Sequence, residues 1–159
     1  MLQQRFQVVT FLFLVLVIFN FSCTSKKKLV SKPLNQVIST AKSYTGTPYK
    51  YGGTTRSGID CSALIYHSFY SIGIAMPRTS ASQSEQGKSI KKNQIKPGDL
   101  LFFATGRKRK QVTHSGIVTQ ASKSDIRFIH SSTSLGVSED YLSNNYWAKA
   151  FLFARRVLD

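Results

Sequence analysis

The chain has 159 residues, of which 42% are hydrophobic, and it carries a formal net charge of +15 at neutral pH. This length suits one domain with an ordinary core and leaves little room for a second domain. So strong a positive charge favours an anionic partner, which for many basic proteins is nucleic acid.

Residues 1–22 resemble the signal peptide of a bacterial lipoprotein. Arg5 supplies a positive charge, residues 8–19 are almost wholly apolar, and a small residue stands directly before Cys23. The apolar run is shorter than the roughly 20 residues that a membrane-spanning helix needs. The pattern predicts that Cys23 is acylated and becomes the mature N-terminus. A retained anchor or cleavage elsewhere stays open, because Asn20 stands where such signals usually have leucine.

Export changes the interpretation of both the charge and the cysteines. We expect a protein of the cell envelope, lipid-anchored to a bacterial membrane and facing the periplasm or the wall, with no nucleic-acid partner. The lysines at 26–28 would contact phospholipid headgroups or form a solvated tether. If Cys23 carries lipid, Cys61 has no disulfide partner, since the chain has only two cysteines. An unpaired cysteine in an exported protein points to a reactive thiol or an intermolecular bond.

Residues 23–32 are polar and basic without apolar periodicity, which predicts a flexible, lipidated linker before a domain over residues 33–159. Apolar residues three and four positions apart over residues 34–44 predict the first helix of this domain. Pro33 suits its first turn and Gly46 its end.

The segment around Cys61 is the strongest local signal. A polar turn containing glycine gives way there to an apolar run, which predicts a helix from Cys61 to about Ser71 with Asp60 as its N-cap. The first backbone N–H groups of a helix are unpaired and its dipole is positive there, so a thiolate is favoured over a thiol. A short polar helix should follow over residues 76–87, where Arg78 is better explained as a local hydrogen-bond anchor than as a ligand for a substrate carboxylate.

Beyond these helices the hydrophobic period changes, and the sequence predicts strands. They are expected over residues 99–104, 112–120, 126–130 and 148–157, with a basic loop at 105–111. Helices first and strands afterwards predict an α+β domain in which N-terminal helices pack on one side of an antiparallel sheet.

The three histidines differ in their suitability as a partner for Cys61. His67 lies six positions after Cys61 on the same predicted helix, so it points about 120° away from the thiol. His114 begins a strand among small residues and suits a general base, whereas His130 ends the next strand and suits a residue that orients that base. Each alone is more commonly structural, but together with an unpaired cysteine they favour catalysis. No Cys-x-x-Cys motif or close histidine pair suggests a zinc site, and no glycine-rich loop suggests a nucleotide.

Six segments in order resemble the NlpC family, papain-like cysteine peptidases of the bacterial cell wall. They are Tyr49 to Gly53, Gly58 to Ser62, Pro77 to Ser80, Pro97 to Leu100, His114 to Ile117, and His130 to Ser132. The resemblance covers residues from about Leu34 to the C-terminus, and it implies a papain-like core.

The resemblance also implies residue roles. Cys61 would be the nucleophile, His114 the base and acid, and His130 the orienting residue. Tyr49 would help bind substrate or the oxyanion beside the thiol. Asp60 and Ser62 would contact the stem peptide of peptidoglycan.

Two residues depart from the family pattern. Ala63 stands where glycine is usual, so its methyl group could crowd the substrate or the helix packing. Ser115 stands where valine is common. These departures bear on the expected catalytic efficiency and leave the expected mechanism unchanged.

The leading hypothesis is a monomeric peptidoglycan endopeptidase without a cofactor, which hydrolyses an amide bond in stem peptides or their cross-links through a cysteine thiolate. Two alternatives stay open. One is a catalytically weak module that binds cell-wall peptides, and the other is an amidase or acyltransferase that uses the same Cys-His pair on another substrate.

Overall fold

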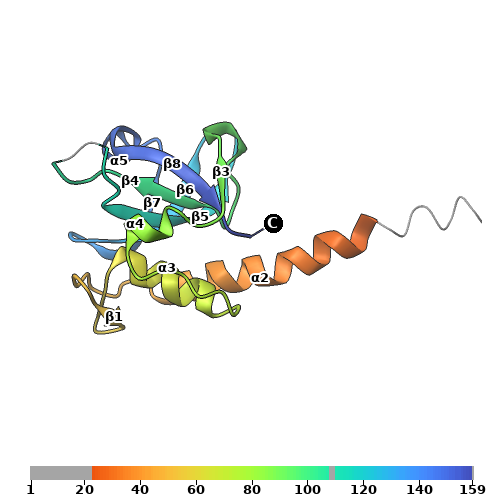
Figure 1. Ribbon diagram of the computed structural model, residues 1–159, viewed down its shortest axis with the longest axis horizontal. Helices are drawn as coiled ribbons and strands as arrows, with labels where there is room; N and C mark the ends of the chain where they lie inside the picture. Colours follow the sequence, from red (N-terminus) through yellow and green to blue (C-terminus); the bar gives the residue numbers. More distant parts are fainter. Residues whose placement is uncertain (1–22, 108–109, 159) are drawn as a thin grey trace, which may run out of the picture. The chain divides into compact units, whose positions relative to one another are not determined.

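The computed structural model describes residues 23–107 and 110–158 (Figure 1). The proposed signal sequence and residues 108–109 of the predicted basic loop lie outside the described residues. The chain divides into two units after Pro33, and the second unit, Leu34–Asp159, contains the sheets and every helix after the first. Among the described residues, no helix combines the length and the apolar character that crossing a membrane requires.

The first described helix, α2, spans Cys23–Ser43. The sequence predicted a helix start near Pro33 and a flexible linker over residues 23–32, but the structure is helical throughout this range. Apolar periodicity could not indicate this part of the helix, because its lysines are good helix formers that create no apolar stripe. Within the second unit, Val37 and Ala41 are fully buried, as the predicted apolar face requires.

A two-stranded hairpin, β1 (Thr54–Thr55) and β2 (Gly58–Ile59), leads into helix α3 (Cys61–Tyr70). The predicted N-cap is confirmed, because the backbone of Asp60 is extended and its side chain accepts a hydrogen bond from the N–H of Ala63. Helix α4 (Ser80–Gln83) is shorter than the predicted helix over residues 76–87.

The main sheet has six antiparallel strands in the order β3-β8-β4-β5-β6-β7, which confirms the predicted α+β class. Its strands are β3 (Lys88–Ile90), β4 (Leu100–Phe103), β5 (His114–Ala121), β6 (Ile126–Ser132), β7 (Gly136–Tyr141) and β8 (Phe151–Arg156). A single 3₁₀ turn, η1 (Lys92–Gln94), joins β3 to β4. Figure 1 shows α3 lying along one side of this sheet.

Two apolar clusters cover the two faces of the sheet. One joins α2 and α3 to β4, β5 and β6 through residues such as Val37, Leu64 and Ile117. The other joins the opposite face to α5 (Asn145–Ala150) through residues such as Phe103 and Trp147. Strand β4 contributes to both clusters, so all four of its residues are apolar and buried rather than alternating.

The sequence missed β3, β7 and α5, and the predicted strand at residues 148–157 is wrong at its start. Residues 148–150 end helix α5, whose first turn is capped by the side chain of Asn144. A six-residue helix is too short to reveal a helical period. Strand β7 has few β-branched residues and lies at the sheet edge, where alternation is weak.

The loop that follows α2 is tied to strand β7 by backbone hydrogen bonds. The N–H of Gly46 donates to the carbonyl of Val137 at 2.9 Å, and the N–H of Val137 donates to the carbonyl of Thr47, also at 2.9 Å. Gly136 has a φ of +66°, and a Cβ there would lie 2.2 Å from the carbonyl oxygen of Thr47. Only glycine therefore fits this close approach.

Candidate active site

Cys61 is the first residue of α3 and contributes its side chain to an open cavity. Its exposed fraction is 8%, and it is a free thiol. The cavity, of about 440 Å³, is also lined by Tyr49, His114, Asp140 and Trp147. Residues from distant parts of the chain thus meet at the N-terminus of one helix, where a developing negative charge is favoured.

His114 and His130 lie side by side on the neighbouring strands β5 and β6. His114 begins β5, and His130 lies within β6, one residue after Ile129, which pairs with Ile117 of β5. The Nε2 atom of His114 is 2.9 Å from Nδ1 of His130, a hydrogen-bonding distance. The structure therefore joins the two histidines that the sequence proposed as base and orienting residue.

Asp140 extends this pair, and the sequence analysis missed it. Its Oδ2 atom lies 3.0 Å from Nε2 of His130, and its side chain is 30% exposed. Strand β7 pairs with β6 so that Asp140 is opposite Phe128, diagonal to His130 and on the same face. A prediction of β7 and its register would have found this carboxylate.

Aromatic rings enclose the histidine pair. The ring of Trp147 stacks on His114 with 5.3 Å between the ring centroids, and it makes an edge contact with His130 with 4.6 Å between the centroids. The centroid of the Phe128 ring lies 5.0 Å from that of His130. Burial, and then the neighbouring His130, lowers the pKa of His114 to about 3. Burial also lowers the pKa of His130, although the hydrogen bond and charge of Asp140 oppose this shift. Both rings are therefore neutral at neutral pH.

Two buried serines contact the thiol side of the site. The hydroxyl of Ser80 is 3.4 Å from Sγ of Cys61 and 3.0 Å from the hydroxyl of Ser115. Ser115 is fully buried, and its hydroxyl pairs with that of Ser80. If Ser115 donates to Ser80, then Ser80 can donate to the sulfur, and both hydroxyl protons are used.

Tyr49 reaches the same cavity from the loop before β1. Its backbone forms a bridge to Ile59, two residues before the thiol. Burial, followed by the charges of Cys61 and Asp60, raises the pKa of Tyr49. Its hydroxyl therefore stays protonated and can donate a hydrogen bond towards the cavity.

Asp60 and Ser62 are engaged by Arg78, which confirms the prediction that this arginine is a local hydrogen-bond anchor. Both Nη atoms of Arg78 donate to Asp60 at 2.9 Å, and Nη1 also donates to Ser62 at 2.8 Å. Asp60 accepts further bonds from the N–H groups of Gly52 and Ala63. Burial alone would raise the pKa of Asp60, but these hydrogen bonds outweigh it and lower the pKa.

The third histidine lies away from this cavity. Nε2 of His67 is 2.8 Å from the carbonyl oxygen of Thr54, and its ring stacks on Tyr44. This position agrees with its predicted exclusion from the site. Among the residues that the structure describes, no cluster of three or more histidine, cysteine, aspartate or glutamate side chains could hold a metal ion.

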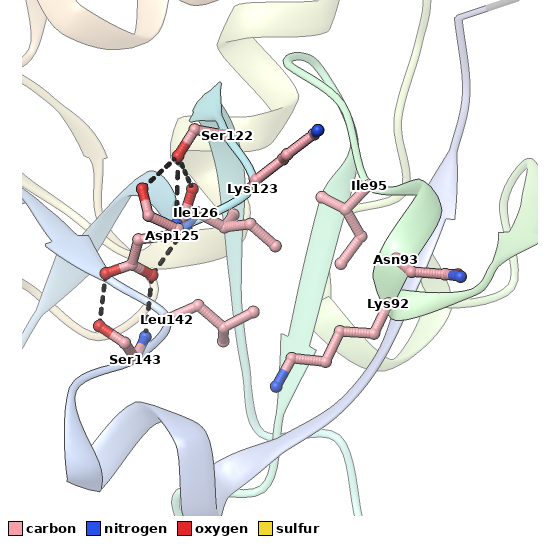
Figure 2. Close-up of a pocket in the computed structure, with 10 residues that line it drawn as sticks. Lys92, Asn93, Ile95, Ser122, Lys123, Asp125, Ile126, Leu142 and Ser143 are labelled. Carbon is pink, nitrogen blue, oxygen red and sulfur yellow. Dashed lines mark hydrogen bonds between the residues drawn. The ribbon is translucent and has the colours of Figure 1, made fainter.

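A second cavity, of about 540 Å³, is lined by other residues (Figure 2). Its lining includes Lys92, Lys123 and the apolar side chains of Ile95 and Leu142. Asp125 also lines it, but its carboxylate accepts hydrogen bonds from the backbone of Ile126 and from Ser143. The cavity shares no lining residue with the one around Cys61.

Comparisons with known proteins agree on one family. Residues 46–156 match the model of the NlpC/P60 family. The chain is 41% identical to the probable endopeptidase NlpC of Escherichia coli over 117 residues, which cover 73% of each protein. It is 36% identical over 116 residues to the murein DD-endopeptidase/LD-carboxypeptidase MepS of the same species, covering 72% of this chain and 58% of that protein. The crystal structure of an NlpC/P60 family protein from Bacillus cereus superposes with a TM-score of 0.71 at 31% identity, covering 79% of this chain and 40% of that one.

Proposed function

Because this chain belongs to the NlpC/P60 family, we propose that it is a cysteine endopeptidase that cleaves peptide bonds in peptidoglycan. The observation that supports this most directly is that His114 lines the same cavity as the thiol of Cys61 and is hydrogen-bonded to His130 behind it. A nucleophile, a base and a group that orients the base are the parts that acyl transfer requires. The substrate polymer is inferred from the names of the relatives, and the reaction type is inferred from the geometry of the site.

The proposed reaction begins with attack of the Cys61 sulfur on the carbonyl carbon of the scissile amide. The thiol proton passes to His114, which is neutral at rest and therefore able to accept it. The oxyanion would be stabilised by the backbone N–H of Cys61 at the helix start and by the hydroxyl of Tyr49.

Collapse of the tetrahedral intermediate breaks the carbon–nitrogen bond and leaves a thioester on Cys61. His114 gives its proton to the departing amine, which completes the first half of the reaction. A water molecule then attacks the thioester, and His114 takes a proton from that water and returns one to the sulfur. The products are a carboxylate, an amine and the free thiol.

Contact with the stem peptide stays a prediction for Asp60 and Ser62. Both side chains are hydrogen-bonded to Arg78, so direct contact with a substrate would require these bonds to open or to be shared. Their present arrangement favours a structural role, in which Asp60 caps α3 and accepts a hydrogen bond from the backbone of Gly52, which lines a cavity together with Cys61.

We also propose that the protein acts at a lipid-anchored position in the cell envelope. The relatives named for cell-wall substrates support the envelope, and the lipoprotein-like signal over residues 1–22 supports acylation of Cys23. Cells fed alkyne-tagged palmitate should label the wild-type protein and should not label a Cys23→Ser variant. Equal labelling of both proteins would rule out this anchor.

The enzymatic proposal is tested with purified full-length protein and isolated sacculi. The wild type should release soluble muropeptides, and Cys61→Ala and His114→Ala should release none above background. His67→Gln is the matched control, because His67 lies on α3 but outside the cavity. Unchanged release by Cys61→Ala would refute the proposal, whereas binding of sacculi without release by the wild type would favour a binding module. Mass spectrometry of the released fragments would identify the bond that is cut.

A further inference from the structure

A carboxylate ends the row of hydrogen-bonded groups that leads from the cavity into β7. Asp140 lies 3.0 Å from Nε2 of His130, whose Nδ1 lies 2.9 Å from Nε2 of His114. His130 is fully buried, so its ring nitrogens depend on these two partners. The row therefore has three members behind the thiol rather than the two that the sequence indicated.

The acceptor character of a carboxylate determines where the protons of this row lie. An ionised carboxylate can only accept hydrogen bonds, so Nε2 of His130 must carry the proton that it donates to Asp140. In a neutral imidazole the other nitrogen is then an acceptor, and Nδ1 of His130 receives the proton of Nε2 of His114. This leaves Nδ1 of neutral His114 without a proton. That nitrogen is the one able to take a proton from Cys61.

We propose that Asp140 is a positioning residue that selects the tautomer of His130 and thereby keeps His114 competent as a base. It touches neither the sulfur nor the scissile bond and acts through His130. The inference rests on the proposed function only for its activity measurement, because the tautomers themselves can be observed without a substrate.

Asp140 also supplies the only carboxylate among the described residues that line this cavity. The other titratable groups that line it are Tyr49, Cys61, His114 and Tyr146. When His114 takes up a proton, the positive charge forms against Trp147 and beside His130, where little water is available to solvate it. A nearby negative charge offsets part of this cost.

Glu139 provides a matched control on the same strand. It is adjacent to Asp140, but it pairs opposite Ile129 and its carboxylate contacts Thr119 and Lys42 on the other face. Glu139→Gln therefore removes one negative charge from β7 without touching the histidine pair. Asp140→Asn keeps the size of the side chain, but its amide can donate to Nε2 of His130 and so favour the opposite tautomer.

The test combines nitrogen-15 NMR of the histidine rings with two rate measurements on the full-length protein. In the wild type, His130 should be protonated at Nε2 and His114 should be unprotonated at Nδ1. In Asp140→Asn, the His130 tautomer should change, alkylation of Cys61 by iodoacetamide at pH 7 should slow, and muropeptide release should fall at least about tenfold, because the wrong tautomer weakens the base. Glu139→Gln should behave as the wild type in all three measurements, and Asp140→Glu should recover part of the activity.

The outcomes separate this inference from the proposed function. A wild-type His130 protonated at Nδ1 would overturn the inference without any variant. Unchanged tautomers, alkylation and release in Asp140→Asn would overturn it as well. Wild-type protein that has the expected tautomers and alkylation but releases no muropeptide would overturn the peptidase assignment and leave the role of Asp140 intact.

Discussion

Gly116 lies two residues after His114 on β5, and its backbone packs closely against β6. A Cβ added there would lie 2.7 Å from Cδ2 of Phe128, 3.0 Å from the backbone oxygen of Ile129 and 3.3 Å from Cβ of His130. An ordinary contact begins near 3.4 Å, so all three atoms would have to move. The backbone oxygen belongs to the strand itself and cannot move alone. Gly116→Ala should therefore push β6 away from β5 and separate the two histidines.

Overpacking of this kind typically costs about 1–3 kcal/mol of the free energy of unfolding. For a domain of this size, that loss corresponds to a fall in Tm of roughly 2–12 °C. The effect on catalysis should be larger than the effect on folding, because displacement of a positioned group by about 1 Å can cost about 100-fold in rate. Urea denaturation and muropeptide release, measured on the same preparations, check both expectations.

Gly106→Ala is the matched control. A Cβ at Gly106 would lie 3.5 Å from the nearest atom, a methyl group of Thr113, which is ordinary van der Waals contact. Its stability should stay within about 0.5 kcal/mol of the wild type, as for most surface substitutions. If Gly116→Ala matched Gly106→Ala in stability and activity, the close approach between β5 and β6 would not be what holds the histidines together.

Three further predictions concern the charge and hydrogen bonds of the site. The pKa of His114 is lowered to about 3 from its usual value of about 6.5, so between these pH values the unfolded chain binds more protons at this residue than the folded chain does. The free energy of unfolding should therefore fall as the pH drops from about 6.5 to 3. Urea titrations should show a weaker pH dependence in His114→Gln than in the wild type. Ser115→Ala should slow alkylation of Cys61 by iodoacetamide about 2- to 12-fold at pH 7, the equivalent of one hydrogen bond of about 0.5–1.5 kcal/mol. An unchanged rate would show that the hydrogen bond from Ser115 to Ser80 does not help Ser80 to donate to the sulfur. Arg78→Met should lower the free energy of unfolding by about 1–3 kcal/mol above pH 4, because the Asp60 carboxylate loses the two hydrogen bonds that Arg78 donates. The difference from the wild type should shrink in more acidic solution, where the Asp60 carboxyl takes up a proton.

Features of the site that depend on one contiguous segment could be predicted from the sequence, whereas those that depend on strand register could not. Cys61 could be predicted because the N-cap and the apolar run after it are contiguous in the chain. The excluded position of His67 followed from helical geometry alone. The catalytic roles of Cys61, His114 and His130 stay predictions, although the structure joins the two histidines at 2.9 Å.

Asp140 and Trp147 could not be found in this way. Asp140 reaches His130 only through the register of β6 with β7, and β7 lacks the alternation that would have identified it as a strand. Trp147 lies on a six-residue helix, directly before the strand that the sequence predicted over residues 148–157. Both residues act through cross-strand and helix–sheet packing, which a pattern along one chain segment does not encode.

The backbone hydrogen bonds that Val137 makes with Gly46 and Thr47 couple the two walls of the cavity to each other. The loop that carries Tyr49 follows Thr47 directly, and Asp140 lies three residues beyond Val137 on the same strand. A fluctuation that opens the tyrosine side would have to break this short ladder or carry β7 with it. Hydrogen exchange at the amide of Val137 therefore reports on the loop that carries Tyr49 and on the strand that carries Asp140. A ligand that restrains either the loop or the strand should slow amide exchange in both.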